Sequence, residues 1–230
     1  MSARIIDGKQ VAAAIRQELQ QKIAALRSET GIQPGLAVVL VGTDPASQSY
    51  VSAKEKACAE IGIYSSDNRL PAETSEEELL ALIDKLNRDP RIHGILVQLP
   101  LPRQISESKI INAIAPEKDV DGFHPVSVGK MVLGEETYLP CTPHGVLQLL
   151  QRCEVNLSGA EVVVVGRSNI VGKPLANLLI QKAPYGNATV TVCHTRTRSL
   201  RNHTLRADII IAAAGCPNTR LTWASFVGSV

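Results

Sequence analysis

The chain has 230 residues, of which 44% are hydrophobic and 20% are charged. These values are typical of globular proteins and exclude a disordered, collagen-like or coiled-coil chain, and the length allows one large domain or two small ones. A net charge of +2 and an aromatic content of 3% argue against nucleic acid or an anionic membrane as a partner, so we expect a small-molecule ligand.

The first predicted element is an amphipathic helix over residues 9–28. Its apolar residues recur at helical spacing, so we expect one face to pack against the rest of the domain. The residues of this face are Val11, Ala14, Ile15, Leu19, Ile23 and Leu26.

Strands and helices then alternate. An apolar strand over 36–42 leads into a helix that Asp44 can cap and Gly62 can end. A second helix over 75–89 begins with a capping-box sequence and precedes a short apolar strand over 94–100. This alternation predicts an α/β domain with a parallel sheet.

Residues 115–145 are rich in glycine and proline and interrupt the alternation. We therefore place a hinge in this stretch and predict a substrate domain over 1–138 and a second domain over 139–230.

The second half resumes the alternation as an incomplete Rossmann-like unit. Its strands are apolar throughout, so we expect both faces of the sheet to be covered. The predicted order is strand, helix, strand and strand, over 161–166, 172–182, 189–193 and 208–215.

A glycine-containing turn lies between the first strand and helix of this unit. Gly166 ends the strand and Gly172 begins the helix, a geometry that directs backbone N–H groups at an anion. The spacing does not fit a nucleotide-hydrolysing phosphate loop, because Pro174 stands where that loop needs a hydroxyl. The dinucleotide fingerprint is also unmet, because Ser168 replaces its second glycine. The turn alone leaves a structural role open.

The charge of the next strand's end favours NADP over NAD. NAD-binding proteins place an acidic residue there, whereas residues 194–198 read His-Thr-Arg-Thr-Arg. Together with Arg167 and Ser168, these donors and cations would attract a 2′-phosphate. A solvated basic loop is the alternative.

Polar residues of the first half form a candidate reaction site. Tyr50 and Lys54 stand four residues apart, hence on one helix face, although such a pair can also be ordinary surface. Gln98 follows a buried parallel strand, where ligands of open α/β sheets bind. Asp119 and Asp121 belong to the glycine-containing segment that follows. We expect these groups to converge.

Five segments carry a family resemblance. They are SYVSAKEKACAEIGI, GILVQLPLP, PEKDVDGFHP, PCTPHGV and VVVVGRSNIVGKPLANLL. In order and spacing they resemble the bacterial-type bifunctional methylenetetrahydrofolate dehydrogenase/methenyltetrahydrofolate cyclohydrolase family, over most of residues 1–215. The resemblance implies NADP-dependent oxidation of 5,10-methylenetetrahydrofolate and hydrolysis of the methenyl product to 10-formyltetrahydrofolate.

The resemblance also implies roles for individual residues. Lys54 corresponds to the central catalytic group, Gln98 to the residue that orients it, and Tyr50 to the residue against the aminobenzoyl part of the folate. Asp121 corresponds to the pterin-binding residue, and Leu99 and Pro100 complete the substrate site.

In the second half the resemblance implies an NADP site and no metal. Arg167 and Ser168 would hold the 2′-phosphate, and Thr195 replaces the serine usual at its position. The full set of expected cofactor residues is Gly166, Arg167, Ser168, Ile170, Val171, Gly172, His194, Thr195 and Arg196. The family also suggests a homodimer through this domain.

The resemblance stops near residues 215–217. The family continues with a V-I-D-V-G strand, a P-G-G-V-G-P-M-T loop and a returning helix, and the tail NTRLTWASFVGSV has none of these. We expect a truncated or frame-shifted chain, or a shortened natural variant, whose nucleotide domain lacks its last strands. Two other functions stay open: an NADP dehydrogenase of another small substrate, and a remnant that binds folate, NADP or a partner without turnover.

The cysteines and the N-terminus favour the cytoplasm. The five cysteines form no C-x-x-C pair, so we expect buried free thiols rather than a disulfide framework or a zinc site. Asp7 and Lys9 stand where a signal peptide would be apolar, and no apolar run is long enough to span a membrane.

Overall fold

The computed structural model describes residues 5–214. The chain divides into two compact units, Met1–Ser127 and Val128–Val230, and each is described by itself. The predicted loss of the last strands and of the returning helix concerns residues outside the described part of the chain.

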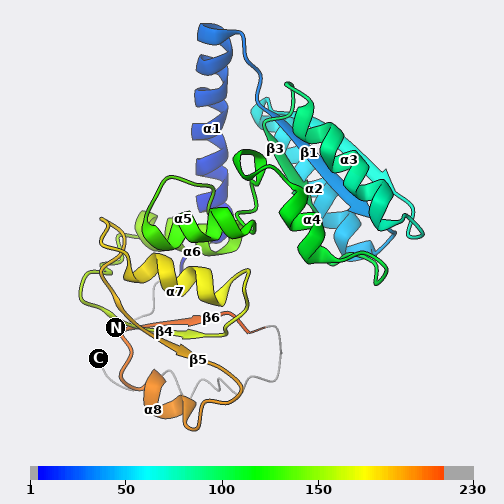
Figure 1. Ribbon diagram of the computed structural model, residues 1–230. Helices are drawn as coiled ribbons and strands as arrows, with labels where there is room; N and C mark the ends of the chain where they lie inside the picture. Colours follow the sequence, from blue (N-terminus) through cyan, green and yellow to red (C-terminus); the bar gives the residue numbers. More distant parts are fainter. Residues whose placement is uncertain (1–4, 215–230) are drawn as a thin grey trace. The chain divides into compact units, whose positions relative to one another are not determined.

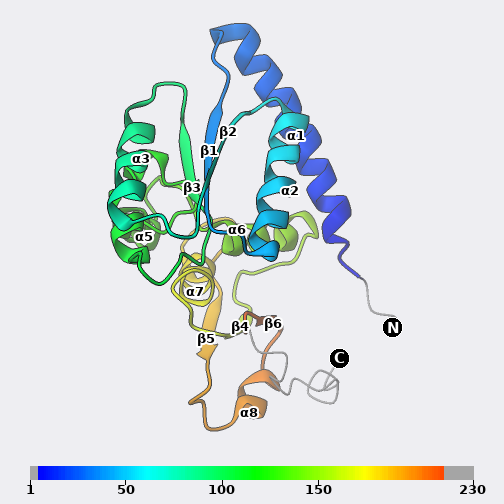
Figure 2. The same ribbon diagram turned by 90° about the vertical axis from the view of Figure 1, so that its right-hand side faces the viewer.

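The first unit is built on a parallel three-stranded sheet in the order β2-β1-β3. Its helices lie in two layers: α2, with α1 outside it, covers one face of the sheet, and α3 covers the other (Figure 2). The predicted parallel α/β architecture is confirmed. The bounds are α1 Gly8–Thr30, β1 Gly35–Val41, α2 Pro45–Ile61, β2 Tyr64–Leu70, α3 Glu76–Arg88 and β3 Gly94–Val97.

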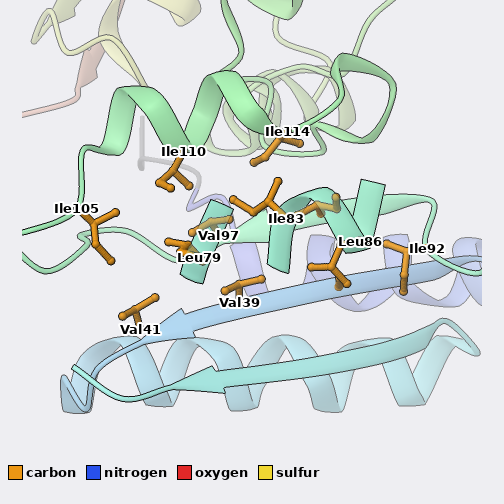
Figure 3. Close-up of a cluster of buried hydrophobic side chains, with 12 residues drawn as sticks. Val39, Val41, Leu79, Ile83, Leu86, Ile92, Val97, Ile105, Ile110 and Ile114 are labelled. Carbon is orange, nitrogen blue, oxygen red and sulfur yellow. The ribbon is translucent and has the colours of Figure 1, made fainter. Parts of the chain in front are cut away.

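The largest apolar core of this unit lies between the sheet and the helices α3 and α4 (Glu107–Ala113) (Figure 3). Leu79 and Ile83 of α3 are fully buried against Val39 of β1. On the opposite face, Val38 and Leu96 pack with Val51 of α2. Burial on both faces explains why β1 and β3 are continuous apolar runs.

The predicted helix ends are also confirmed. Asp44 caps α2, and Gly62 ends it with a φ of +88°, a conformation that glycine adopts without strain. At the start of α3, the Ser75 hydroxyl accepts the N–H of Glu78 at 3.1 Å, and the Glu78 carboxylate accepts the N–H of Ser75 at 2.8 Å. Both halves of the predicted capping box are therefore formed.

Loss of this cap predicts a measurable loss of stability. Ser75→Ala should lower the free energy of unfolding by about 1 kcal/mol, because the N–H of Glu78 loses its acceptor. Urea unfolding followed by circular dichroism measures the change. Ser28→Ala, at an exposed position inside α1, is the control and should cause no loss. An equal loss in both variants would contradict a specific role for the cap.

Helix α1 departs from its prediction. Asp7 caps it, but Ile23 is the only one of the six predicted packing residues that is buried. Ala14, Leu19 and Leu26 are exposed within the described part of the chain. The helical periodicity predicted the helix correctly, but periodicity does not show which part of the protein covers the apolar face.

The glycine- and proline-rich stretch contains more regular structure than a hinge. It holds the 3-10 turn η1 (Pro116–Lys118) and the helix α5 (Pro125–Leu133), and the helix α6 (Cys141–Arg152) begins within it. Pro116 and Pro125 are the first residues of their elements, where a missing N–H costs nothing.

The second unit contains a parallel three-stranded sheet in the order β5-β4-β6. Helix α7 lies on one face and the short α8 on the other (Figure 1). The central strand β4 is buried along most of its length, whereas β5 and β6 are only partly buried. The prediction that both faces of the sheet are covered is therefore confirmed for β4 and only in part for the two outer strands of the described chain. The bounds are β4 Glu161–Val165, α7 Gly172–Ile180, β5 Thr189–Cys193, α8 Leu200–Thr204 and β6 Ile209–Ala212.

The cysteines only partly match the prediction of buried free thiols. Cys58 and Cys193 are free and buried, and burial raises the pKa of both thiols. Cys141 is exposed and Cys153 is half-buried. Cys216 lies outside the described residues. Between residues 5 and 214, no helix combines the length and the apolar character needed to cross a membrane.

Candidate active site

Lys54 and Gln98, two of the predicted site residues, contact each other. The Lys54 ammonium donates a hydrogen bond to the Gln98 side-chain oxygen at 3.0 Å. Lys54 comes from the third turn of α2, and Gln98 follows directly after β3, so residues 44 positions apart meet at the carboxyl end of the parallel sheet. Ligands of open α/β sheets bind at this end.

Gln98 is held at both its backbone and its side chain. Its N–H donates to the carbonyl of Val39 in β1 at 2.9 Å, and its side-chain amide nitrogen donates to the carbonyl of Leu99 at 2.7 Å. The amide oxygen therefore has one orientation, toward Lys54. Leu99 is half-buried, Pro100 is exposed, and the peptide between them is cis.

Tyr50 lies one helical turn before Lys54 and is 64% exposed. The helix that carries both residues is capped at its start by Asp44, whose carboxylate accepts the N–H of Ser47 at 2.8 Å. The hydrogen bond from the backbone of Ser47 is the main reason that the pKa of Asp44 is lowered. An exposed aromatic ring beside a half-buried ammonium offers a flat apolar surface next to a proton donor.

Asp121 lies in the loop after η1. Asp119, two residues earlier, forms a parallel bridge with Ile95 of β3, so this loop runs beside the strand that precedes Gln98. Gly94 allows this approach, because a Cβ there would lie 2.4 Å from the side chain of Val120. The structure thus brings Lys54 and Gln98 together and places the loop that contains Asp121 beside strand β3 of the same sheet.

In the second unit, the glycine turn is closely packed. Gly166 follows β4 with a φ of +136°, and a Cβ at this position would lie 2.3 Å from the carbonyl oxygen of Ala213. A Cβ on Gly172 would lie 2.2 Å from the carbonyl oxygen of Gly166. Both positions therefore require glycine, and the backbone approaches that they permit bring the turn against the start of α7.

Ser168 organises this turn. Its hydroxyl oxygen accepts the N–H groups of Val171 at 3.1 Å and Gly172 at 3.3 Å. Both bonds use the oxygen as acceptor, so the hydroxyl proton is left to donate to a ligand. Ile170, also in the turn, is 41% exposed.

The predicted basic residues lie at the same edge of the second sheet. The N–H of Gly166 donates to the carbonyl of Cys193 at 2.8 Å, which places the ends of β4 and β5 side by side. Arg167 and Arg196 are exposed, and within residues 5–214 neither has a carboxylate within ion-pair distance. Thr195 is exposed in the same turn. The guanidinium groups of Arg167 and Arg196 can therefore bind an anionic group.

The sequence analysis counted Thr197 among the donors for a 2′-phosphate but missed its role in shaping the turn after β5. The Thr197 hydroxyl accepts the N–H of His194 at 2.8 Å, and the His194 ring nitrogen Nδ1 accepts the N–H of Arg196 at 3.1 Å. The available signal was a threonine three residues after the first turn residue, which is a common turn-forming spacing.

Two family models match the chain. The model described as tetrahydrofolate dehydrogenase/cyclohydrolase, catalytic domain, matches residues 6–121. The model described as the NAD(P)-binding domain of the same family matches residues 140–222.

Curated relatives agree with these matches. A "Bifunctional protein FolD" of Dehalococcoides mccartyi (strain CBDB1) is 60% identical over 217 residues, which are 94% of this chain and 73% of the relative. A protein of the same name from Geotalea daltonii is 60% identical over 94% of this chain and 75% of its own. The chain thus spans about three quarters of the length of these relatives.

Solved structures give the same result. The bifunctional FolD methylenetetrahydrofolate dehydrogenase/cyclohydrolase of Campylobacter jejuni is 50% identical, with a TM-score of 0.90, over 95% of this chain and 76% of its own. The Trypanosoma brucei enzyme, solved with NADP cofactor and inhibitor, is 38% identical, with a TM-score of 0.88, over 94% of this chain and 74% of its own. The chain therefore belongs to the tetrahydrofolate dehydrogenase/cyclohydrolase family.

Proposed function

We propose that this chain oxidises 5,10-methylenetetrahydrofolate with NADP and hydrolyses the resulting 5,10-methenyltetrahydrofolate to 10-formyltetrahydrofolate. The observation that carries this proposal is the hydrogen bond of 3.0 Å between Lys54 and Gln98 at the carboxyl end of the first sheet. It supplies an oriented ammonium group where a ligand of an α/β sheet binds, and the chain's family performs these two reactions.

Residues around Lys54 hold the folate in this proposal. Tyr50 packs against the aminobenzoyl ring, and Asp121 binds the pterin. Gln98, Leu99 and Pro100 line the site between them. The fixed orientation of the Gln98 amide keeps the Lys54 ammonium at one place relative to the one-carbon bridge, and such positioning is a large part of the rate enhancement of many enzymes.

Hydrolysis requires a proton to be moved. Water adds to the methenyl carbon, and one C–N bond of the bridge then breaks. One water proton is transferred to the departing ring nitrogen and the other is released, so the cation gives the neutral formyl product. In this proposal Lys54 exchanges these protons by general acid–base catalysis. Gln98 keeps the ammonium aimed at the reacting carbon.

The donor set of the glycine turn fits NADP. When bound, NADP accepts the hydride that the folate loses. Gly166 and Gly172, with Ile170 and Val171 between them, would allow the backbone of the turn to hold the pyrophosphate. The positive charges and hydrogen-bond donors for a 2′-phosphate come from Arg167, Ser168, His194, Thr195 and Arg196.

Arg167→Ala should weaken NADP binding and leave NAD binding nearly unchanged. A charge-assisted hydrogen bond to a phosphate contributes about 1.5–3 kcal/mol, so the dissociation constant for NADP should rise by about 10- to 100-fold. Isothermal titration calorimetry with both nucleotides measures the effect. Arg88→Ala, an exposed arginine of α3, is the matched control. Equal weakening for both nucleotides would place Arg167 away from the 2′-phosphate.

A direct assay tests the proposed function. The purified 230-residue chain is mixed with methylenetetrahydrofolate and NADP, the absorbance of NADPH is followed, and the folate product is identified by mass spectrometry. We expect NADPH and 10-formyltetrahydrofolate. Tight binding without an absorbance change would instead make the chain a binding remnant, and reduction of NADP by another substrate alone would make it a different dehydrogenase.

We also propose a cytoplasmic homodimer with a domain boundary at 138/139. The free thiols of Cys58 and Cys193 are typical of a reducing compartment. The two family models leave residues 122–139 between them, and the proposed boundary lies in that interval. Light scattering after size exclusion tests the dimer, and a mass of one chain, 24.7 kDa, would contradict it.

A further inference from the structure

Asp119 is a buried carboxylate in the loop between η1 and α5, with only 2% of its surface exposed. Its Oδ2 atom accepts the N–H of His124 at 2.8 Å and the hydroxyl of Ser127 at 2.8 Å, and its Oδ1 atom accepts the N–H of Phe123 at 3.3 Å. All three donors lie four to eight residues later in the chain. The side chain therefore closes this loop on itself.

The backbone of Asp119 fixes the turn between these points. Its carbonyl accepts the N–H of Gly122 at 3.1 Å, and Gly122 has a φ of +65°. Asp119 also forms the bridge with Ile95 of β3. The four-residue turn from Asp119 to Gly122, which contains Asp121, is thus held next to the strand that leads to Gln98.

The preceding residue attaches the loop to helix α3. The Lys118 ammonium donates to the carbonyls of Leu86 at 3.2 Å and Asp89 at 2.9 Å, which lie at the carboxyl end of that helix. The loop is therefore fastened before the turn by Lys118 and after it by the side chain of Asp119. Loss of the Asp119 bonds would free the second attachment only.

We propose that Asp119 is a positioning residue of the folate site: it holds the turn that carries Asp121 and thereby sets the affinity for the folate without contacting it. This inference rests on the proposed function. A buried carboxylate is costly unless donors surround it, so packing alone would favour an apolar residue at this position. Three donors directed at one side chain are instead what a fixed loop conformation requires.

Two variants test this proposal. Asp119→Asn keeps the shape but turns an acceptor into a donor facing the donors of His124 and Ser127, and Ser127→Ala removes one of the three bonds. We expect the KM for methylenetetrahydrofolate to rise about tenfold or more in the first and by a smaller factor in the second, with kcat nearly unchanged. The dissociation constant for tetrahydrofolate should rise in parallel, and that for NADP should not change.

Ser75→Ala is the control, because it removes a cap of α3 without touching the loop. Its KM for the folate should equal that of the wild type. An unchanged folate KM and dissociation constant in Asp119→Asn and Ser127→Ala, with a lowered melting temperature, would make Asp119 a purely structural residue and overturn the proposal. If the wild type itself has no turnover, the proposed function fails separately, and the tetrahydrofolate dissociation constants still decide the role of Asp119.

Discussion

Lys54→Met should abolish the hydrolysis of methenyltetrahydrofolate and leave NADP binding intact. Methionine keeps the length and the apolar stem of lysine, so the variant removes mainly the ammonium that donates to Gln98. A positioned acid–base group contributes about 10²- to 10⁴-fold to a rate, and we expect a loss of that size in kcat for the hydrolysis. The decay of the methenyl absorbance measures hydrolysis, and calorimetry measures NADP binding.

Lys56→Met is the matched control for this prediction. Lys56 is a lysine of the same helix, two residues farther along, and its loss should leave both reactions unchanged. Hydrolysis at the wild-type rate by the Lys54→Met enzyme would remove Lys54 from the mechanism. Loss of hydrolysis and of NADP binding together would indicate a structural role instead.

Gly166→Ala should disrupt the nucleotide-binding unit. The new Cβ would lie 2.3 Å from the carbonyl oxygen of Ala213, which follows β6, and the φ of +136° is strained for any other residue. Backbone strain and overpacking each cost about 1–3 kcal/mol, so we expect a loss of roughly 3 kcal/mol or more in the free energy of unfolding. NADP affinity should fall as well, because the turn must move to relieve the contact.

Gly129→Ala separates this effect from the general effect of replacing a glycine. Gly129 lies in α5 and does not have a positive φ, and a Cβ added to it would meet no atom within 4 Å. Alanine there should be neutral or slightly stabilising, because it favours the helix. Urea unfolding and NADP titration of both variants give the comparison, and a Gly166→Ala protein as stable as the wild type would refute the close packing of the turn.

The sequence predicted those parts of the fold in which local pattern and burial agree. The strands β1, β3 and β4 are apolar because both of their faces are covered, and the caps of α2 and α3 are formed by residues only three positions apart. Strand β2 was missed. Its sequence YSSDNRL has no apolar run and its side chains are exposed or only partly buried, so its place in the sheet depends on its pairing with β1.

The candidate site was predictable only in part. Lys54 and Gln98 could be predicted as site residues because each is marked by a local feature. Lys54 follows Tyr50 by one helical turn, and Gln98 comes directly after a buried strand. The network of Asp119 was not visible, since its partners are backbone N–H groups and one serine, and no residue type marks such groups in a sequence. The exposed face of α1 is a second example, because its sequence pattern did not reveal which part of the protein would cover it.

Transfer of deuterium tests the central claim most directly. The chain is incubated with NADP and methylenetetrahydrofolate that carries deuterium at both hydrogens of the one-carbon bridge, and the nucleotide and folate products are analysed by mass spectrometry. The proposed function predicts NADPH and 10-formyltetrahydrofolate that each contain one deuterium. Unlabelled NADPH, or no reduced nucleotide at all, would contradict it.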